Sequence, residues 1–512
     1  MTPAPVIPSP VEEILARRAR AATADHGAEL KRGAVFNTIA LLASNFRGIF
    51  TFLVARLLGP AALGIFSVAW ATTDLISKIG IFGLDNAVTT FIARAEAAGD
   101  RARSRALFRL VVALALVQSA VVAVAAIVFI RIFGDRLGLQ PELVSALAVL
   151  FCAMPGVALY RVSVAVSRGM KVMEHDIYSR GLTESAATTL AFLVALGVGL
   201  TTFAPEVAVI AGTAASGLVA LLLAGALFRG VPPGEAVASL RSEARRLLAF
   251  AAPISAYQLL NSVIFRLDVI MLAFFIGRAP GVTLATVGIY GAVVEVAGGL
   301  RKVNQAFNPI FAPVVAEMTA TGEQGRAAAT YAQLAQWMLW ILCPLVAALA
   351  LAGGAILLIF GPAFPQGSTW LTIVALACAT NAFVSLGETV LMVQRPHLNL
   401  INSLITCAVA VGANLWLIPR FGVMGAAFGI LLPFVVQGGL RYGALRWLFK
   451  WRNPWSNVAP PILATIAALV PALVCRALLG GNAGQIVAAV IFLALFGALW
   501  WRHSRPSGRR PA

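Results

Sequence analysis

Charged side chains inside apolar stretches are the residues of this sequence that could do chemistry. Arg47 lies in the middle of one stretch long enough to cross a membrane, and Asp74 and Lys78 lie within the next. A charge at the bilayer centre costs about 2.5–3.5 kcal/mol on the insertion scale, so such residues persist where they face water or a partner. Ser44 and Thr51 fall on the helix face of Arg47, and Asp74 and Lys78 share another face. These positions predict a polar cavity inside a helix bundle, although Asp74 and Lys78 could instead form a structural ion pair.

Later apolar stretches carry the same kind of residue. Arg266 continues a polar stripe of stretch 247–276, and Lys302 shares a face with Glu295 in stretch 287–310. Cations at membrane depth favour an anionic substrate, since Arg and Lys bind phosphate well. The residues expected to hold a phosphate head group are Arg47, Lys78, Arg161, Arg266 and Lys302. The carboxylates expected to couple transport to a proton or another cation are Asp74, Glu295 and Glu388, whereas Asp268 could simply cap a network between helices.

Composition places the whole chain in a membrane. Of its 512 residues, 60% are hydrophobic and 12% are charged, whereas soluble domains carry about 25% charged residues. The net charge of +18 could suggest a nucleic-acid partner, but most Lys and Arg lie in short loops on one side of the expected spans. This is the pattern of the positive-inside rule, so we expect no nucleic acid and place both termini in the cytoplasm.

Hydrophobic stretches of about 20 residues or more predict an all-α integral membrane protein with about fourteen transmembrane helices. The expected spans are 34–57, 62–84, 106–130, 143–165, 181–200, 207–228, 247–276, 287–310, 331–358, 368–392, 398–418, 423–440, 457–477 and 484–501.

A weak internal repeat divides these spans into two lobes. Residues 55–69 resemble 273–293, and residues 92–106 resemble 315–329. The repeat predicts two six-helix lobes in pseudo-two-fold relation, with a cavity between them and two extra C-terminal helices. The expected parts are a basic cytoplasmic tail 1–33, an N-lobe 34–228, a cytoplasmic loop 229–246, a C-lobe 247–443, helices 13 and 14 at 444–501, and a cytoplasmic tail 502–512.

Cysteine and histidine patterns predict neither a metal centre nor a cofactor. The five cysteines lie singly in apolar segments, and the four histidines are scattered near helix ends or in tails. No Cys/His spacing typical of zinc sites occurs, and no GxxxxGK[ST] motif suggests direct use of ATP.

One stretch brings a family into view. Residues 412–427 read GANLWLIPRFGVMGAA, which resembles the N-x-x-L-I-P-x-[YF]-G-x-x-G-A-A pattern of Wzx-like oligosaccharide flippases. These belong to the superfamily that includes MATE exporters and lipid II flippases. ARLLGPAALGIFS at 55–67 is similar to the family's first hairpin, and RLDVIMLAFFIG with VGIYGAV is similar to its seventh and eighth spans.

This resemblance implies a transporter, not an enzyme. It would move undecaprenyl-diphosphate-linked oligosaccharides across the cytoplasmic (inner) membrane by alternating access, driven by an ion gradient. Its partners would be the lipid-linked oligosaccharide, membrane lipids, glycosyltransferases and a polysaccharide polymerase. The pathways it allows include the O-antigen of lipopolysaccharide, capsule and exopolysaccharide. No substrate motif of the family matches residue by residue, so the site residues rest on helical position alone.

Two other functions remain as alternatives. A MATE-like drug or cation exporter would need acidic, aromatic cavities, which the excess of cations disfavours. A membrane-embedded polysaccharide polymerase or ligase would need a large external loop or clustered carboxylates and histidines near one membrane face. The external loops expected here are about ten residues at most.

Overall fold

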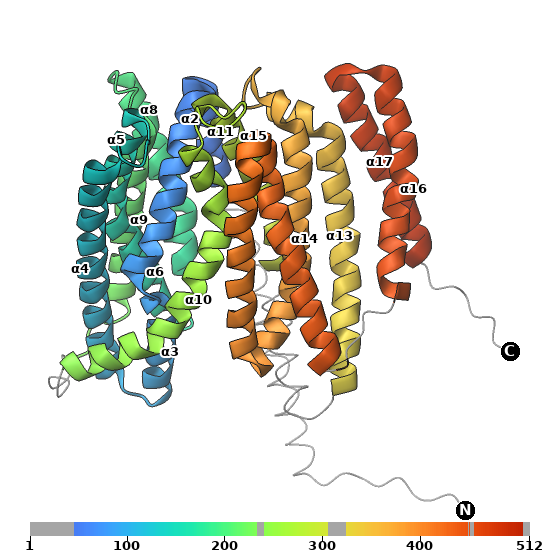
Figure 1. Ribbon diagram of the computed structural model, residues 1–512. Helices are drawn as coiled ribbons and strands as arrows, with labels where there is room; N and C mark the ends of the chain where they lie inside the picture. Colours follow the sequence, from blue (N-terminus) through green and yellow to red (C-terminus); the bar gives the residue numbers. More distant parts are fainter. Residues whose placement is uncertain (1–45, 233–239, 306–323, 449, 451–454, 505–512) are drawn as a thin grey trace, which may run out of the picture.

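The computed structural model describes residues 46–232, 240–305, 324–448, 450 and 455–504, and this part of the chain is helical throughout its regular structure (Figure 1). The N-terminal half contains α2 (Phe46–Ile81), α3 (Leu84–Ala97), α4 (Arg101–Phe133), α5 (Pro141–Leu150), α6 (Met154–Gly169), the π-helix η2 (Ile177–Glu184), α8 (Ser185–Gly197) and α9 (Ala204–Ala226). The C-terminal half contains α10 (Leu240–Phe274), α11 (Leu284–Gly298), α13 (Gln324–Leu358), α14 (Ser368–Gln394), α15 (Pro396–Leu448), α16 (Trp455–Leu479) and α17 (Gly481–Ser504).

The α2 segment is a hairpin rather than one straight helix. Gly59 has φ 84° and ψ 179°, a backbone conformation that interrupts the helix, and Pro60 follows it. The Phe50 and Phe66 rings, which flank this turn, are 5.4 Å apart and meet edge to face. Two residues so far apart along a straight helix could not touch, so the chain reverses at Gly59.

The α15 segment reverses in the same way at Gly422. This residue has φ 56° and ψ −133°, and Pro419 precedes it by three positions. Across the turn, the Asn414 side-chain amide donates to the carbonyl of Gly429 at 3.4 Å. An added Cβ at Gly425 would lie 2.3 Å from the carbonyl oxygen of Leu417, so only glycine allows this close approach. The residues that carry the family resemblance therefore build a turn.

These reversals reconcile the observed helices with the expected spans. Eleven helices of the described residues are long and apolar enough to cross a membrane. Two of them, α2 and α15, each hold two of the expected spans, and η2 with α8 forms a shorter helix at the expected fifth span. The all-helical membrane fold is confirmed. The first half of span 34–57 lies outside the described residues.

Two expected loops contain helix. Within 85–105, α3 buries Leu84, Val88 and Ile92 at helical spacing, although its other face is too polar for a membrane span. Within 229–246, α10 begins at Leu240, earlier than expected, and residues 233–239 lie outside the described part. In α3 these apolar residues pack against neighbouring helices, which a search for long hydrophobic runs does not detect.

The helices form two lobes. Helices α2–α9 make the N-lobe on the left of Figure 1, and α10–α15 make the C-lobe. The lower part of α10 crosses beneath the N-lobe, where the Phe250 ring lies 5.6 Å from the Phe91 ring. The residue bounds of the lobes stay a prediction.

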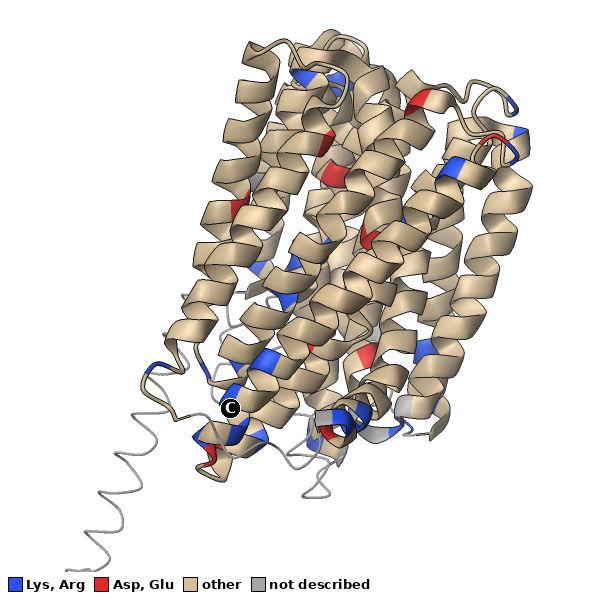
Figure 2. Cartoon of the chain, turned by 90° about the vertical axis from the view of Figure 1, so that its left-hand side faces the viewer, with Lys and Arg blue, Asp and Glu red and all other residues tan. Residues whose placement is uncertain are grey.

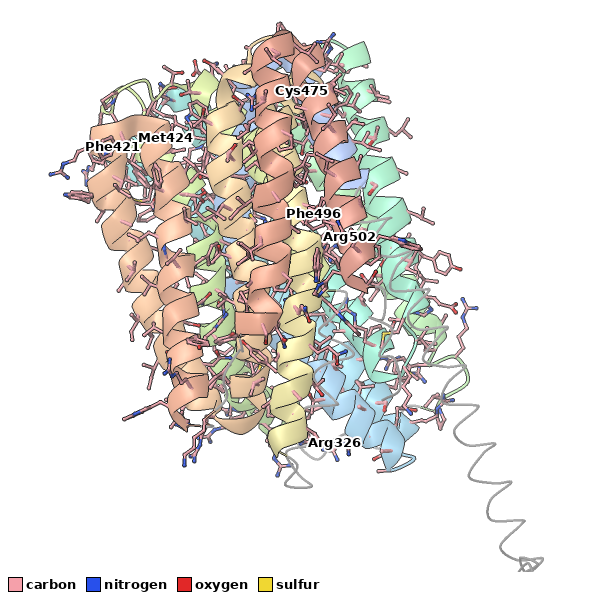
Figure 3. The ribbon with its side chains drawn as sticks, turned by 90° about the vertical axis from the view of Figure 1, so that its right-hand side faces the viewer. Arg326, Phe421, Met424, Cys475, Phe496 and Arg502 are labelled. Carbon is pink, nitrogen blue, oxygen red and sulfur yellow. The ribbon has the colours of Figure 1, made fainter. Side chains whose placement is uncertain are left out.

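Helices α16 and α17 lie at the outer edge of the C-lobe and pack on α13. Their contact is an alanine-rich cluster, in which the Phe496 ring of α17 lies 5.4 Å from the Trp340 ring of α13 (Figure 3). The Gln485 side chain of α17 also accepts a hydrogen bond from the Ala355 amide at 2.9 Å. These two helices therefore extend the C-lobe and do not reach the space between the lobes.

The two ends of the bundle differ in charge. We call the end that carries the Gly59 and Gly422 turns the upper end and the opposite one, with the turn at Gly99, the lower end. Figure 2 shows Lys and Arg gathered at the lower end, together with a smaller set inside the bundle. The positive-inside rule predicts that the lower end faces the cytoplasm.

Near the upper end, the lobes touch through backbone. A Cβ atom added at Gly64 of α2 would lie 2.1 Å from the Leu284 carbonyl oxygen of α11. One added at Gly288 of α11 would lie 1.8 Å from the Pro60 carbonyl oxygen. Paired glycines of this kind let membrane helices approach without intervening side chains. The crossing of α2 and α11 therefore brings the lobes into direct contact near the upper end.

We expect Gly288→Ala to separate α2 from α11, because a methyl group there would overlap the Pro60 carbonyl. The measurement is the labelling rate of Ser67→Cys, in a background without native cysteines, by a membrane-impermeant maleimide added to each side in turn. Gly412→Ala is the matched control, since a Cβ at Gly412 meets nothing within 4 Å. Faster labelling from the upper side in Gly288→Ala alone is expected. Equal rates in both variants would contradict the assigned role of the α2–α11 contact in limiting access from the upper side.

Candidate functional site

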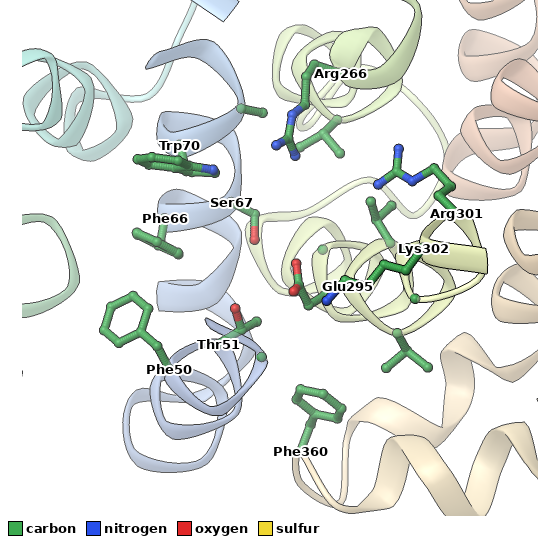
Figure 4. A pocket seen from close by; sticks show the side chains of 18 of the residues that line it. Phe50, Thr51, Phe66, Ser67, Trp70, Arg266, Glu295, Arg301, Lys302 and Phe360 are labelled. Atoms are coloured by element: carbon green, nitrogen blue, oxygen red, sulfur yellow. The ribbon is translucent and has the colours of Figure 1, made fainter. Parts of the chain in front are cut away.

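A cavity of about 490 Å³ lies between the two lobes. The α2 hairpin contributes Thr51 and Ser67 from the N-lobe, and α10 and α11 contribute Arg266 and Glu295 from the C-lobe (Figure 4). The polar side chains of both lobes point into one space, as the sequence predicted for the region between two repeats.

Four cations line this cavity: Arg180, Arg266, Arg301 and Lys302. Glu295 is the one carboxylate among the described lining residues. Figure 4 shows the guanidinium groups of Arg266 and Arg301 directed into the same region, and Lys302 extending toward Glu295. The excess of positive charge gives the cavity the character of an anion site.

The structure brings together three of the predicted site residues, Arg266, Lys302 and Glu295. Sequence reasoning missed Arg180 and Arg301. Arg180 stood at the edge of an expected loop, but it lies in η2, and π-helical turns are frequent at functional sites. Arg301 follows Gly298, where α11 ends, and that ending turns two successive cations inward.

The Arg301 guanidinium rests on an aromatic ring. Its central carbon lies 4.9 Å from the centroid of Phe265, in the range of a cation–π contact. This contact orients the guanidinium at the cavity wall without neutralising its charge. Arg301 can therefore still donate hydrogen bonds to an anion.

A second charged group lies beside the cavity around Asp74. The Asp74 carboxylate accepts from Arg161 Nη2 at 3.4 Å and lies 3.2 Å from Arg266 Nη2. Asp74 is thus paired with arginines of α6 and α10, whereas the sequence suggested Lys78, on its own helix, as a possible partner. Helical spacing identified the charges, but only the tertiary packing shows that Arg161 and Arg266 pair with Asp74.

The remaining predicted residues lie elsewhere. Arg47 falls at the start of α2, and its side chain lies outside the described residues. Lys78 and Arg161 are not among the cavity-lining residues, although Arg161 reaches it indirectly through Asp74.

Glu388 belongs to a separate network within the C-lobe. Its carboxylate is 2.9 Å from Arg441 Nη2 and accepts a hydrogen bond from the Tyr257 hydroxyl. Arg441 is 2% exposed, so this is a buried ion pair that joins α14 to α15. Its position resembles a structural bridge, and its charges balance within the protein.

Asp268 also links two helices. This carboxylate is 1% exposed and accepts a hydrogen bond of 2.6 Å from the Tyr290 hydroxyl, which connects α10 to α11. The interpretation of Asp268 as part of a network between helices is confirmed. Within the described residues, no three His, Cys, Asp or Glu side chains are grouped to hold a metal ion.

We expect Arg441→Leu to destabilise the fold by about 3–5 kcal/mol, because it leaves the Glu388 carboxylate partly buried without its cation. The measurement is thermal unfolding in detergent. The double variant Arg441→Leu/Glu388→Gln should regain most of the loss, since it removes both charges. Arg420→Leu, at an exposed arginine, is the control. A single Arg441→Leu variant as stable as this control would contradict the structural role.

The comparisons with known proteins agree with this architecture. A sequence model of the family described as "Polysaccharide biosynthesis protein" matches residues 30–318. No curated protein matches the sequence. Among solved structures, the lipid II flippase MurJ in an inward closed conformation matches with a TM-score of 0.70 at 11% identity, covering 92% of this chain and 99% of MurJ.

Two MATE transporter structures also match. An inward-facing multidrug resistance MATE family transporter of the MOP superfamily has a TM-score of 0.65 at 14% identity, covering 81% of this chain and 98% of the other. A point mutant of the Vibrio cholerae MATE transporter VcmN has a TM-score of 0.59 at 15% identity, covering 85% of this chain and 99% of the other. At such identities these structures establish a shared fold.

Proposed function

This chain belongs to the polysaccharide biosynthesis protein family, and from that premise we propose that it moves an undecaprenyl-diphosphate-linked oligosaccharide across the cytoplasmic membrane. The chain is a multi-pass membrane protein with the fold of flippases and MATE transporters. The substrate class, the direction of transport and the energy source are the proposed part.

The observation that carries the proposal is the charge of the cavity between the lobes. Arg266, Arg301 and Lys302 line it, Glu295 is the one carboxylate among its described lining residues, and Asp74 beside it pairs with Arg266. A diphosphate presents several acceptor oxygens and more than one negative charge, which matches a group of Arg and Lys donors. A cationic drug would instead be repelled, so the chemistry of the cavity favours the lipid-linked sugar over drug export.

The arrangement of the lobes supports alternating access. The lobes touch near the upper end at the α2–α11 crossing, and the head group would enter from the lower end while the lipid tail stays in the bilayer. Rocking of the lobes would then open the upper end. Both termini and the lower end would face the cytoplasm, in line with the Lys and Arg concentration there. Glycosyltransferases would supply the substrate and a polymerase would consume it.

The proposed function is a transport reaction, so it is tested by transport. Purified protein is reconstituted into liposomes with a fluorescent undecaprenyl-diphosphate oligosaccharide in one leaflet, and its appearance in the other is timed. Arg266→Ala, Arg301→Ala and Lys302→Ala should each slow crossing about tenfold, because a charge-assisted hydrogen bond contributes about 1.5–3 kcal/mol.

Arg420→Ala provides the matched control, since Arg420 lies at the α15 turn, away from the cavity, and stacks over Trp416 at 4.7 Å. The Arg420→Ala protein should move the fluorescent lipid between the leaflets at the same rate as the unmodified protein. Crossing no faster than in empty liposomes would contradict the function. Crossing at the normal rate in all three cavity variants would contradict the role of the cavity cations.

Glu295 is the carboxylate that we propose for ion coupling. It lines the cavity near Lys302, whereas Asp74 and Glu388 are held by arginines. We expect Glu295→Gln to abolish the stimulation of transport by an imposed proton or sodium gradient, because the amide cannot take up a proton or neutralise a cation. Glu295→Asp keeps the charge and should keep the stimulation. Undiminished stimulation in Glu295→Gln would assign coupling to another group.

A further inference from the structure

The Asp74 carboxylate joins the two lobes through a charge. On one side it pairs with Arg161 of α6, within the N-lobe, and on the other with Arg266 of α10, in the C-lobe. The three side chains are only 15%, 21% and 28% exposed, respectively, so water screens their interaction incompletely. A partly buried pair of this kind stabilises whichever arrangement of the lobes allows it to form.

The pair lies beside the cavity, because Arg266 is one of its lining residues. Along α2, the cavity-lining residues Ser67 and Trp70 precede Asp74, which is one helical turn closer to the lower end. The α2–α11 crossing holds the lobes in contact near the upper end. An anion in the cavity therefore lies next to the Asp74–Arg266 pair.

Arg266 is part of both the cavity wall and the ion pair with Asp74. It lines the cavity and pairs with Asp74 at the same time. Arg301 and Lys302 lie in the same cavity wall, so a phosphate held by these two cations would also attract Arg266. A phosphate can offer two acceptor oxygens to a guanidinium, as a carboxylate does, and it carries additional charge.

Losing Arg266 would not leave Asp74 buried without a cation. Arg161 remains on the same lobe and would continue to neutralise it. The large penalty of an uncompensated buried carboxylate is therefore avoided. If Asp74 were paired with a single arginine, transfer of that arginine from Asp74 to a phosphate would be much less favourable.

We propose that Asp74 is a latch between the lobes that the substrate's phosphate releases by taking Arg266. This inference rests on the proposed function for the identity of the anion, but the latch itself is a property of the ligand-free protein. An anionic head group breaks this ion pair and so weakens the contact between the lobes beside the cavity. A neutral or cationic ligand leaves Asp74 bound to Arg266, so the latch selects substrates by charge as well as by fit.

The test measures access to the cavity from the lower side. Ser67→Cys, in a background with the native cysteines replaced by alanine, is labelled by an impermeant maleimide in membranes that expose this side. The rate is measured without ligand, with inorganic pyrophosphate, and with undecaprenyl diphosphate. Asp74→Asn should label at least about fivefold faster than the Asp74 protein without ligand, as expected when a coupling between two states is removed. Either anion should accelerate labelling of the Asp74 protein and leave Asp74→Asn unchanged.

Charge exchange separates a latch from a merely structural role. Asp74→Arg/Arg266→Asp restores an ion pair between the lobes, so the cysteine introduced by Ser67→Cys should be labelled slowly in this variant without ligand. In Asp74→Arg alone it should be labelled fast. Thermal unfolding of each variant confirms that it is folded. Equal ligand-free rates in Asp74→Asn and the Asp74 protein, or a charge exchange that fails to restore slow labelling, would overturn the latch.

The two ligands keep this inference distinct from the proposed function. If undecaprenyl-linked sugars fail to cross but the ligand-free rates differ as expected and pyrophosphate accelerates labelling, the latch stands and the substrate is another phosphate. If the sugars cross but the ligand-free rates are the same, the function stands and the latch is wrong.

Discussion

The cost of a charge in hydrocarbon is the constraint on which this structure depends. Each cation buried within the bundle must find an anion, an aromatic ring or water, because the bilayer offers none of these. Arg441 forms an ion pair with Glu388, Arg161 forms one with Asp74, and Arg301 makes a cation–π contact with the ring of Phe265. The helices are arranged so that these partners come from different segments, which makes the ionic contacts part of the fold and also of its possible movements.

Backbone contact is the second constraint, and it acts where charges are absent. Gly64 and Gly288 let α2 and α11 approach to a distance that no side chain would permit. The lobes are therefore held together near the upper end by this packing, beside the cavity by the Asp74–Arg266 pair, and at the lower end by α10, whose Phe250 and Glu243 contact Phe91 and Arg103 of the N-lobe. Packing does not respond to the charge of a ligand, but an ion pair does. The Asp74–Arg266 pair includes a cavity-lining arginine, so it is an ionic contact that a charged head group in the cavity can reach.

The sequence predicts the helices well because length and hydropathy are local properties. It also predicts the hairpin turns, since Gly59 before Pro60 and Gly422 after Pro419 are recognisable locally. It fails for α3, whose apolar face is hidden among charged residues, and although it identifies Arg161 and Arg266 as site residues, it does not predict that they pair with Asp74. Neighbours on one helix can be read from spacing, but these two arginines come from segments far along the chain. Arg180 was missed because a π-helical turn cannot be seen in composition.

The two groups of membrane-depth arginines show how a structural charge differs from a functional one. Arg441 is 2% exposed and forms an ion pair with the Glu388 carboxylate, so its charge is compensated within the protein. Arg301 rests on an aromatic ring in the wall of a cavity of about 490 Å³, where cations outnumber the described carboxylates. A cavity with unbalanced positive charge is stabilised when an anion enters, whereas a balanced pair gains nothing from one. Arg266 stands between these cases, because its carboxylate belongs to the opposite lobe, and this position allows the binding of an anion to change the contact between the lobes.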